Sequence, residues 1–294
     1  MDPVPWKVSL HGGHSATFCD HAQGDLRQIL TAAVEAGISV FGVTEHAPRL
    51  GKRFLYPREL ELGWDVSKLE KNFQRYRTVL DLLVGEFSQH LLILKGFETE
   101  VVPSASYAEI MLGYRSEMEF DYMVGSVHHV EEVQIDGDSS DFNQALVLTG
   151  GLEALAVRYY HSVARMVEAL RPEVVGHLDL IRKNGRHYGS LETPAIQKAA
   201  REALEVISCH DCILDINMAG YRKGLGSPYP DPWLLTQAHA MGIGVCFGDD
   251  SHGPDQVGAG FEETRSYLLD NSIFEIRTLV KERDRVVQKS IPLS

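Results

Sequence analysis

Three histidines lie close together near the start of the sequence, in the stretch SLHGGHSATFCDHAQG at residues 9–24. They are His11, His14 and His21, and two glycines separate the first from the second. A polar loop with solvent-facing imidazoles would explain any one of them. Neutral imidazole is the commonest protein metal ligand, however, so a cluster of three favours a metal site.

Further potential metal ligands follow nearly every apolar run that could form a strand. These are Glu45 and His46, Glu98 and Glu100, His128 and His129, His177 and Asp179, and Asp249, Asp250 and His252. The run at 212–218 is instead followed by Arg222 and Lys223. In a barrel of parallel strands, the residues at the carboxyl ends of the strands meet at one mouth. The joint pattern therefore predicts one shared site rather than separate solvated side chains.

Mixed imidazole and carboxylate ligands favour zinc, iron or manganese, whereas calcium prefers oxygen ligands alone. The candidates outnumber the ligands of one tetrahedral ion, so we expect two or three divalent ions bridged by a carboxylate. Such ions activate water near neutral pH and neutralise charge on a phosphoryl group. The residue types therefore predict phosphoester hydrolysis.

Short apolar runs alternate with segments of helical periodicity and must position these residues. The expected strands are 7–10, 38–45, 91–98, 121–128, 173–179, 212–218 and 243–250. The expected helices are 25–37, 65–87, 107–117, 152–171, 193–208, 231–242 and 262–280. This alternation predicts an α/β fold with a parallel sheet, either a closed barrel of about seven strands or an open doubly wound sheet. The segments 47–64 and 130–144 are expected to be long loops that act as lids or binding loops.

Local signals mark several ends of these helices. Asp25, Asp65 and Thr193 are expected helix starts, because short polar side chains there can accept hydrogen bonds from the first turn. Gly37 and Gly242 stand where a helix should end before the next strand. We expect a single domain over residues 1–294, since no linker or low-complexity tract divides the chain.

Composition restricts the partners. The formal net charge is −13, which disfavours a nucleic-acid partner and favours a small substrate. The sequence shows neither a secretory leader nor a membrane-spanning run, so we expect a cytoplasmic enzyme without a membrane partner. The four cysteines are too few for a disulfide framework, and the pair Cys209 and Cys212 is interpreted as structural. Nothing in the sequence indicates an oligomeric state.

The ordered motifs HGGHS, TEH, GFE, GSVHH, GHLDLIRK and GDDSH resemble those of the PHP (polymerase and histidinol phosphatase) metallo-phosphoesterase family. With FCDHAQG and INMAGYRKGLGSPYP, the set is similar to the histidinol-phosphatase branch, over about residues 8–258. The resemblance implies a distorted seven-stranded (β/α) barrel with a trinuclear metal site. It also implies hydrolysis of L-histidinol phosphate to L-histidinol and phosphate in histidine biosynthesis, by attack of a metal-bound hydroxide.

The resemblance also implies a ligand set. One ion would take His11, His14, Glu98 and Asp250, a second Glu98, His128 and His177, and a third His21, His46 and His252. Glu98, rather than Glu100, is expected to bridge, because the family's carboxylate follows a G-x-E pattern. We expect catalytic roles for Glu98, Asp250 and His252. The family's usual H-x-H is H-x-x-H here, and we expect the two glycines to supply the positive φ that turns the second imidazole back.

Basic residues beyond the fifth and sixth strands could bind the substrate. The motifs LIRKNG and GYRKG place Arg182 and Arg222 there, with Lys183 and Lys223 as the next candidates. Guanidinium groups match phosphate oxygens, so the two arginines are expected to clamp a monoester. Two alternatives stay open: a PHP phosphoesterase for another small phosphate ester or nucleotide, and a barrel that binds metal only structurally.

Overall fold

Seven parallel strands form the centre of the protein in a computed structural model that describes residues 4–283 and 285–294. Their order is β1-β2-β3-β4-β7-β8-β9. The strands are β1 (Val8–Ser9), β2 (Val40–His46), β3 (Leu92–Glu98), β4 (Tyr122–Gly125), β7 (Val174–Val175), β8 (Ile213–Asn217) and β9 (Val245–Gly248). Six lie within the runs expected from the sequence, and β2 extends one residue beyond its expected run 38–45, to His46.

Backbone hydrogen bonds join the two edge strands of this sheet. Leu10 N donates to Phe247 O at 2.8 Å, and Asp250 N donates to His11 O at 2.8 Å. These bonds link the segment after β1 to β9 and to the residues that follow it. The expected closed barrel is therefore confirmed over the open doubly wound alternative.

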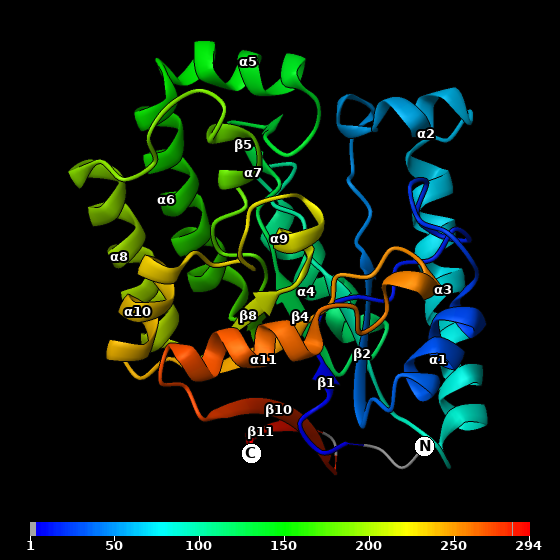
Figure 1. The fold of residues 1–294 in the computed structure, drawn as a ribbon. Coiled ribbons are helices and arrows are strands. Elements are labelled where there is room, and N and C mark those ends of the chain that lie inside the picture. Colours follow the sequence, from blue (N-terminus) through cyan, green and yellow to red (C-terminus); the bar gives the residue numbers. More distant parts are fainter. Residues whose placement is uncertain (1–3, 284) are drawn as a thin grey trace.

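Helices cover the outside of the barrel, as Figure 1 shows. They are α1 (Leu26–Glu35), α2 (Pro57–Glu61), α3 (Val66–Phe87), α4 (Tyr107–Glu117), α5 (Ser139–Thr149), α6 (Leu152–Leu170), α7 (Arg182–Gly185), α8 (Pro194–Cys209), α9 (Ala219–Arg222), α10 (Pro232–Ala240) and α11 (Phe261–Asp270), with short 3₁₀ turns at Lys52–Phe54 and Pro254–Gln256. The side chains of Asp25, Asp65 and Thr193 accept hydrogen bonds from the first turns of α1, α3 and α8, as expected. Gly37 and Gly242 follow the ends of α1 and α10 with φ of 71° and 73°.

The last expected helix is wrong over its second half. Helix α11 ends at Asp270, and residues 275–280 lie instead in β10 (Glu275–Glu282), which pairs with β11 (Arg285–Pro292). Ser272 has φ of 62°, a turn conformation that stops the helix. In Figure 1 this hairpin lies at the end of the barrel opposite α5.

The two expected loops also contain short regular elements. The segment 47–64 includes a 3₁₀ turn and α2, while 130–144 includes part of a small hairpin of β5 (His129–Val130) and β6 (Val133–Gln134) and the start of α5. Asp138 caps α5 by accepting from the backbone nitrogens of Ser140 and Asp141. Both segments reach the rim of the barrel, where they line the pocket described below.

One contiguous core fills the barrel and the layer beneath the helices. It extends from Val8 in β1 to Leu293 after β11, and the single domain stays a prediction from the sequence. Residues 1–3 and 284 of the expected domain lie outside the described residues. Among the described helices, none is long and apolar enough to cross a membrane. Cys209 and Cys212 are free thiols, the first exposed and the second buried.

Candidate metal centre

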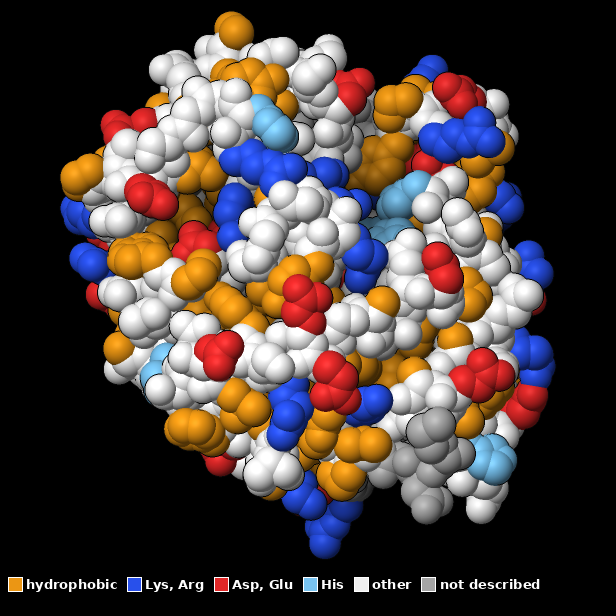
Figure 2. All heavy atoms as spheres, viewed as in Figure 1, with side chains coloured by type: hydrophobic (Ala, Val, Ile, Leu, Met, Phe, Trp, Pro, Cys, Tyr) orange, Lys and Arg blue, Asp and Glu red, His pale blue; other side chains and the backbone are white. Residues whose placement is uncertain are grey.

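A pocket of about 480 Å³ opens at the carboxyl ends of the strands. Figure 2 shows it as a hollow in which histidine side chains lie beside lysine and arginine side chains. Seven of the nine expected ligands line the pocket: His21, His46, Glu98, His128, His177, Asp250 and His252. The other two, His11 and His14, are fully buried directly beneath it. The structure therefore brings all nine residues together.

Glu98, the last residue of β3, lies at the centre of this group. Its Oε1 is 3.0 Å from His177 Nε2, 3.2 Å from His11 Nε2 and 3.4 Å from His128 Nε2. Its Oε2 is 2.8 Å from His46 Nδ1. A carboxylate that faces imidazoles on both of its oxygens has the arrangement needed to bridge two ions. Burial raises the pKa of Glu98, but His11, His128 and His46 hold it well below its usual value.

Asp250, just after β9, provides the second carboxylate. Its Oδ1 lies 3.7 Å from His14 Nε2 and 3.5 Å from His252 Nδ1. The ring of His14 stacks on the rings of both His46 and His252, with centroids 4.2 Å apart in each case. Asp250 and His177 have φ of 46° and 24°, a backbone region that non-glycine residues seldom adopt and that is found at functional sites.

The H-x-x-H spacing is accommodated by the two intervening glycines, as the sequence predicts. Gly12 and Gly13 have φ of 152° and 81°. A Cβ on Gly12 would lie 2.1 Å from Asp249 Oδ1, so a side chain would collide with the strand end beside it. The turn directs His11 and His14 to the same side, where both imidazoles face Glu98.

Three further carboxylates hold the imidazoles from behind. Asp215 Oδ2 is 2.8 Å from His11 Nδ1, Glu45 Oε1 is 3.2 Å from His14 Nδ1, and Glu100 Oε1 is 3.4 Å from His128 Nδ1. An Nδ1–H that donates to a carboxylate leaves Nε2 free to bind an ion. The sequence analysis counted Glu45 and Glu100 among the potential metal ligands, not as supports of the imidazoles, and it missed Asp215, whose only signal is its place in a buried strand.

Replacing Asp215 by Asn is expected to lower the affinity for one ion by roughly ten- to a hundredfold, because His11 loses the carboxylate that fixes its ring. Zinc titration of the apoprotein with a competing chelator measures the change. Asp211→Asn is the matched control: Asp211 is exposed, and asparagine tolerates its φ of 53°. Equal zinc affinity in Asp215→Asn and the native protein would show that Asp215 does not position the ligand.

Imidazole nitrogens without hydrogen-bond partners indicate whether the site suits metal ions. His14 Nε2, His46 Nε2 and His177 Nδ1 are buried without hydrogen-bond partners within the described chain, while His11 Nε2 and His46 Nδ1 face the carboxylate of Glu98. Such groups cost free energy in a folded protein unless something binds them. Every one of the nine expected ligands also falls into a set of three or four side chains whose donor atoms lie within 4.8 Å of one another. The residues therefore fit a cluster of divalent ions.

Comparison with known proteins identifies the family. The model of the PHP domain family matches residues 11–219, which is more than two thirds of the chain. The chain belongs to the PHP family. The expected family and the expected barrel fold are both confirmed.

Relatives of this PHP protein span nearly its whole length. It is 33% identical to the "Probable histidinol-phosphatase" of Schizosaccharomyces pombe, over 89% of this chain and 85% of the relative. It is 27% identical to the histidinol-phosphatase of Saccharomyces cerevisiae, over 88% of each chain. Its fold matches a crystal structure of histidinol phosphate phosphatase from Lactococcus lactis, which was solved with zinc, L-histidinol and phosphate, with a TM-score of 0.66 at 19% identity over 96% of this chain and 99% of that one.

Four imidazoles of the PHP centre have raised pKa values in the metal-free protein: Glu98 raises those of His11 and His46 against the effect of burial, and His128 and His21 are raised as well. Burial lowers the pKa of His128, but Glu100 and Glu98 raise it to about 10. Burial likewise lowers the pKa of His21, and its contacts with Asp20 and Cys19 raise it to about 9. An imidazole binds a metal ion only after it has lost its proton. Protons and metal ions therefore compete for these four side chains.

We expect the affinity for zinc to increase as the pH rises toward about 9, because protons on His21 and His128, and on His11 and His46, compete with zinc below that pH. Zinc binding at pH 7 should release protons. Calorimetry in buffers with different heats of ionisation measures the number of protons released. His161→Gln, on the exposed face of α6, should leave the count unchanged. A zinc affinity that is constant from pH 6 to pH 9 would contradict the expectation.

The expected phosphate-binding residues separate into two groups. Lys183, Arg222 and Lys223 line the pocket, whereas Arg182 lies outside it. The guanidinium of Arg182 donates to Ser227 Oγ at 2.9 Å and to Pro228 O at 2.7 Å, and it packs over the ring of Tyr229. The structure therefore brings three of the four cations to the metal ligands and engages the fourth in holding the loop after α9.

Proposed function

We propose that this PHP protein is a metal-dependent histidinol-phosphatase that hydrolyses L-histidinol phosphate to L-histidinol and phosphate. The observation that carries the proposal is one pocket with two opposed sets of groups: buried imidazoles and carboxylates on its floor, and three cations at its rim. The names of the fungal relatives support the same substrate. The pocket volume of about 480 Å³ suits a small phosphate monoester.

The floor of the pocket would hold two or three divalent ions, with zinc, iron or manganese as the candidates. The proposed ligands are His11, His14, His21, His46, Glu98, His128, His177, Asp250 and His252. When bound, such ions supply an activated water near neutral pH and neutralise charge on the phosphoryl group. Glu98 and Asp250 would balance the positive charge of the ions, and Asp215 and Glu45 orient the rings of His11 and His14 that would hold them.

The rim of the pocket would bind the phosphate oxygens. Arg222 donates from Nη2 to the carbonyl oxygens of Asp249 and Asp250 at 2.6 and 2.8 Å, which anchors its guanidinium beside the metal ligands. Burial lowers the pKa of Lys223, and the repulsion of Lys183 and Arg222 adds to this effect, although the carboxylates of Asp250 and Asp136 oppose it. A dianionic phosphate placed here would relieve that repulsion.

An acidic group on the pocket wall favours an amine-bearing substrate. Asp136 follows β6 and lines the pocket with Gln134, whose amide donates to Asp136 Oδ1 at 3.2 Å. Burial raises the pKa of Asp136, but His128 and Lys183 hold it below its usual value, so the side chain is a carboxylate at neutral pH. A carboxylate beside the phosphate-binding cations would attract the ammonium group of histidinol phosphate and repel a second phosphate.

Metal removal and reconstitution test the proposal. Dialysis against a chelator should abolish phosphate release from L-histidinol phosphate, and adding back zinc, iron(II) or manganese should restore it. Activity that survives complete metal removal would overturn the metal-dependent mechanism. The cytoplasmic location stays a prediction from the sequence.

A further inference from the structure

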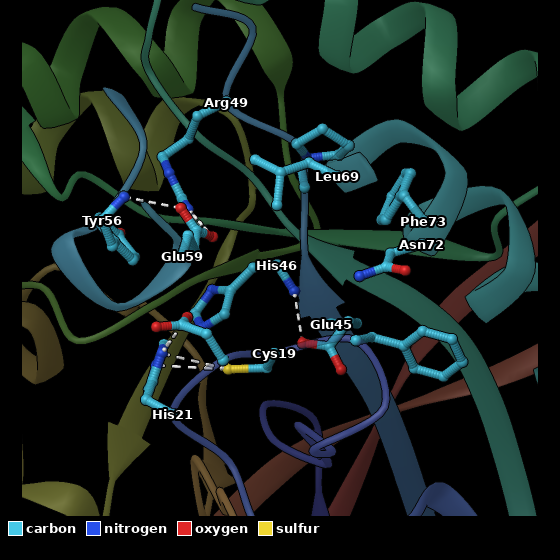
Figure 3. Close-up of a pocket in the computed structure, with 14 residues that line it drawn as sticks. Cys19, His21, Glu45, His46, Arg49, Tyr56, Glu59, Leu69, Asn72 and Phe73 are labelled. Carbon is cyan, nitrogen blue, oxygen red and sulfur yellow. Dashed lines mark hydrogen bonds and ion pairs between the residues drawn. The ribbon is translucent and has the colours of Figure 1, made fainter. Parts of the chain in front are cut away.

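Cys19 lies among histidines of the metal centre. It belongs to the loop between β1 and α1, and its side chain is almost fully buried. Its Sγ is 3.3 Å from His21 Nδ1 and 3.5 Å from His21 Nε2. Figure 3 shows the sulfur beside the rings of His21 and His46 in the pocket that the segment 47–64 covers.

The spacing of the donor atoms matches that of a tetrahedral ion site. Zinc binds thiolate at about 2.3 Å and imidazole at about 2.0–2.1 Å, so a tetrahedral angle sets a sulfur-to-nitrogen separation of about 3.5 Å. Cys19 Sγ and His21 Nε2 already have this separation. One donor atom from each of Cys19, His21, His46 and His252 lies within 4.8 Å of the other three.

The surroundings orient these side chains toward a common centre. Asp20 Oδ1 is 2.9 Å from His21 Nδ1, so an Nδ1–H that donates to this carboxylate leaves Nε2 free. The carbonyl oxygen of Asp250 likewise lies 3.0 Å from His252 Nδ1, which leaves Nε2 of His252 free. The Nδ1 of His46 lies 2.8 Å from Glu98 Oε2, and its Nε2 is buried without a hydrogen-bond partner within the described chain.

The other buried cysteines lack such surroundings. Cys212 Sγ has the carbonyl oxygen of His210 as its polar neighbour, and Cys246 is enclosed in β9 within the core. Burial as a small apolar side chain accounts for both. It does not account for Cys19, whose sulfur faces imidazole nitrogens.

We propose that Cys19 Sγ is a fourth ligand of the third metal position, with His21, His46 and His252, and that its thiolate makes this position select zinc over manganese. The inference rests on the proposed metal cluster. On binding, the thiol proton leaves to solvent and a sulfur–metal bond forms. Thiolate and imidazole favour zinc, whereas manganese favours carboxylate, carbonyl and water ligands.

Cobalt(II) is the probe, because a thiolate bound to it gives a near-ultraviolet charge-transfer absorption that imidazole and carboxylate ligands do not. Apoprotein titrated with cobalt should develop this absorption, and its intensity should correspond to one sulfur–cobalt bond per chain. Cys19→Ser should take up cobalt at the other positions without the absorption. The matched control, Cys212→Ser, should keep it in full.

Metal selectivity gives a second readout that needs no activity. After equilibration with equal zinc and manganese, the native protein should retain one more zinc per chain than Cys19→Ser. Zinc should also protect Cys19 from alkylation in the unmutated chain, which peptide mass analysis detects even if the variant fails to fold.

Cobalt uptake without charge-transfer absorption, or alkylation of Cys19 at the same rate with and without zinc, would overturn the inference. Both results can be obtained whether or not L-histidinol phosphate is the substrate. Sulfur ligation in a protein that does not hydrolyse this ester would leave the inference standing and contradict the proposed function. Hydrolysis without sulfur ligation would do the reverse.

Discussion

Replacing Glu98 by Gln is expected to lower kcat/KM for L-histidinol phosphate by on the order of a thousandfold or more, equivalent to about 4 kcal/mol. The reason is geometric: Glu98 faces His11, His128 and His177 with one oxygen and His46 with the other. A neutral amide cannot bridge two ions or balance their charge. Metal analysis should therefore show that two ions are weakened together.

The control for this change is Glu205→Gln, an exposed position on α8. It should keep both activity and metal content. Loss of activity in Glu98→Gln with a full set of tightly bound ions would show that the carboxylate is not the bridge. Loss of one ion alone would place the bridging role on another residue, with Asp250 as the next candidate.

Replacing Arg222 by Ala should lower kcat/KM by roughly 10- to 150-fold, because one charge-assisted hydrogen bond to phosphate is worth about 1.5–3 kcal/mol. The loss should fall mainly on KM if the guanidinium binds the ground state and the transition state equally. Metal content should be unchanged, since Arg222 contacts the carbonyl oxygens of Asp249 and Asp250 and not the donor atoms of the ligands.

Arg201→Ala is the matched control, because Arg201 is exposed on α8 and packs against Trp233. Its kinetics should be those of the native protein. Native kinetics in Arg222→Ala would move the phosphate-binding role to Lys183 and Lys223. Arg182→Ala should differ from both by lowering thermal stability, since it removes the hydrogen bonds to Ser227 and Pro228.

The barrel and the placement of the metal ligands could be predicted because each depends on local order along the chain. Apolar runs such as 38–45 form strands wherever they are buried on both faces, and parallel pairing then brings their carboxyl ends together. His46 and Glu98 are themselves the last residues of β2 and β3 and pair in register. Closure of the sheet into a barrel brings the ligands on the other strand ends to the same mouth.

The choice between neighbouring basic residues could not be predicted in the same way. Arg182 and Lys183 are adjacent in a helical turn, where successive side chains point about 100° apart. The rotation of that turn about its helix axis decides which of the two side chains faces the pocket. This rotation depends on packing against Tyr229 and the loop after α9. The sequence LIRKNG contains no signal for this rotation.

The end of the last helix and the role of Cys19 were missed for different reasons. Residues 262–280 contain apolar positions at helical spacing throughout, so the change from a helical to a strand pattern is not visible in the sequence. The turn at Asn271 and Ser272 is also formed without glycine or proline. Cys19 faces His46 and His252 only because the loop after β1, the end of β2 and the loop after β9 converge. Such contacts depend on tertiary structure and leave no mark on the local sequence.

The most direct measurement of the central claim is kcat/KM of the zinc-loaded protein for L-histidinol phosphate beside a panel of other monoesters. The panel should include a nucleoside monophosphate, glycerol phosphate and p-nitrophenyl phosphate. We predict that L-histidinol phosphate has the highest value by at least tenfold, because Asp136 and the rim cations recognise its two ends. A nucleotide or another ester that equals or exceeds it would contradict the assignment.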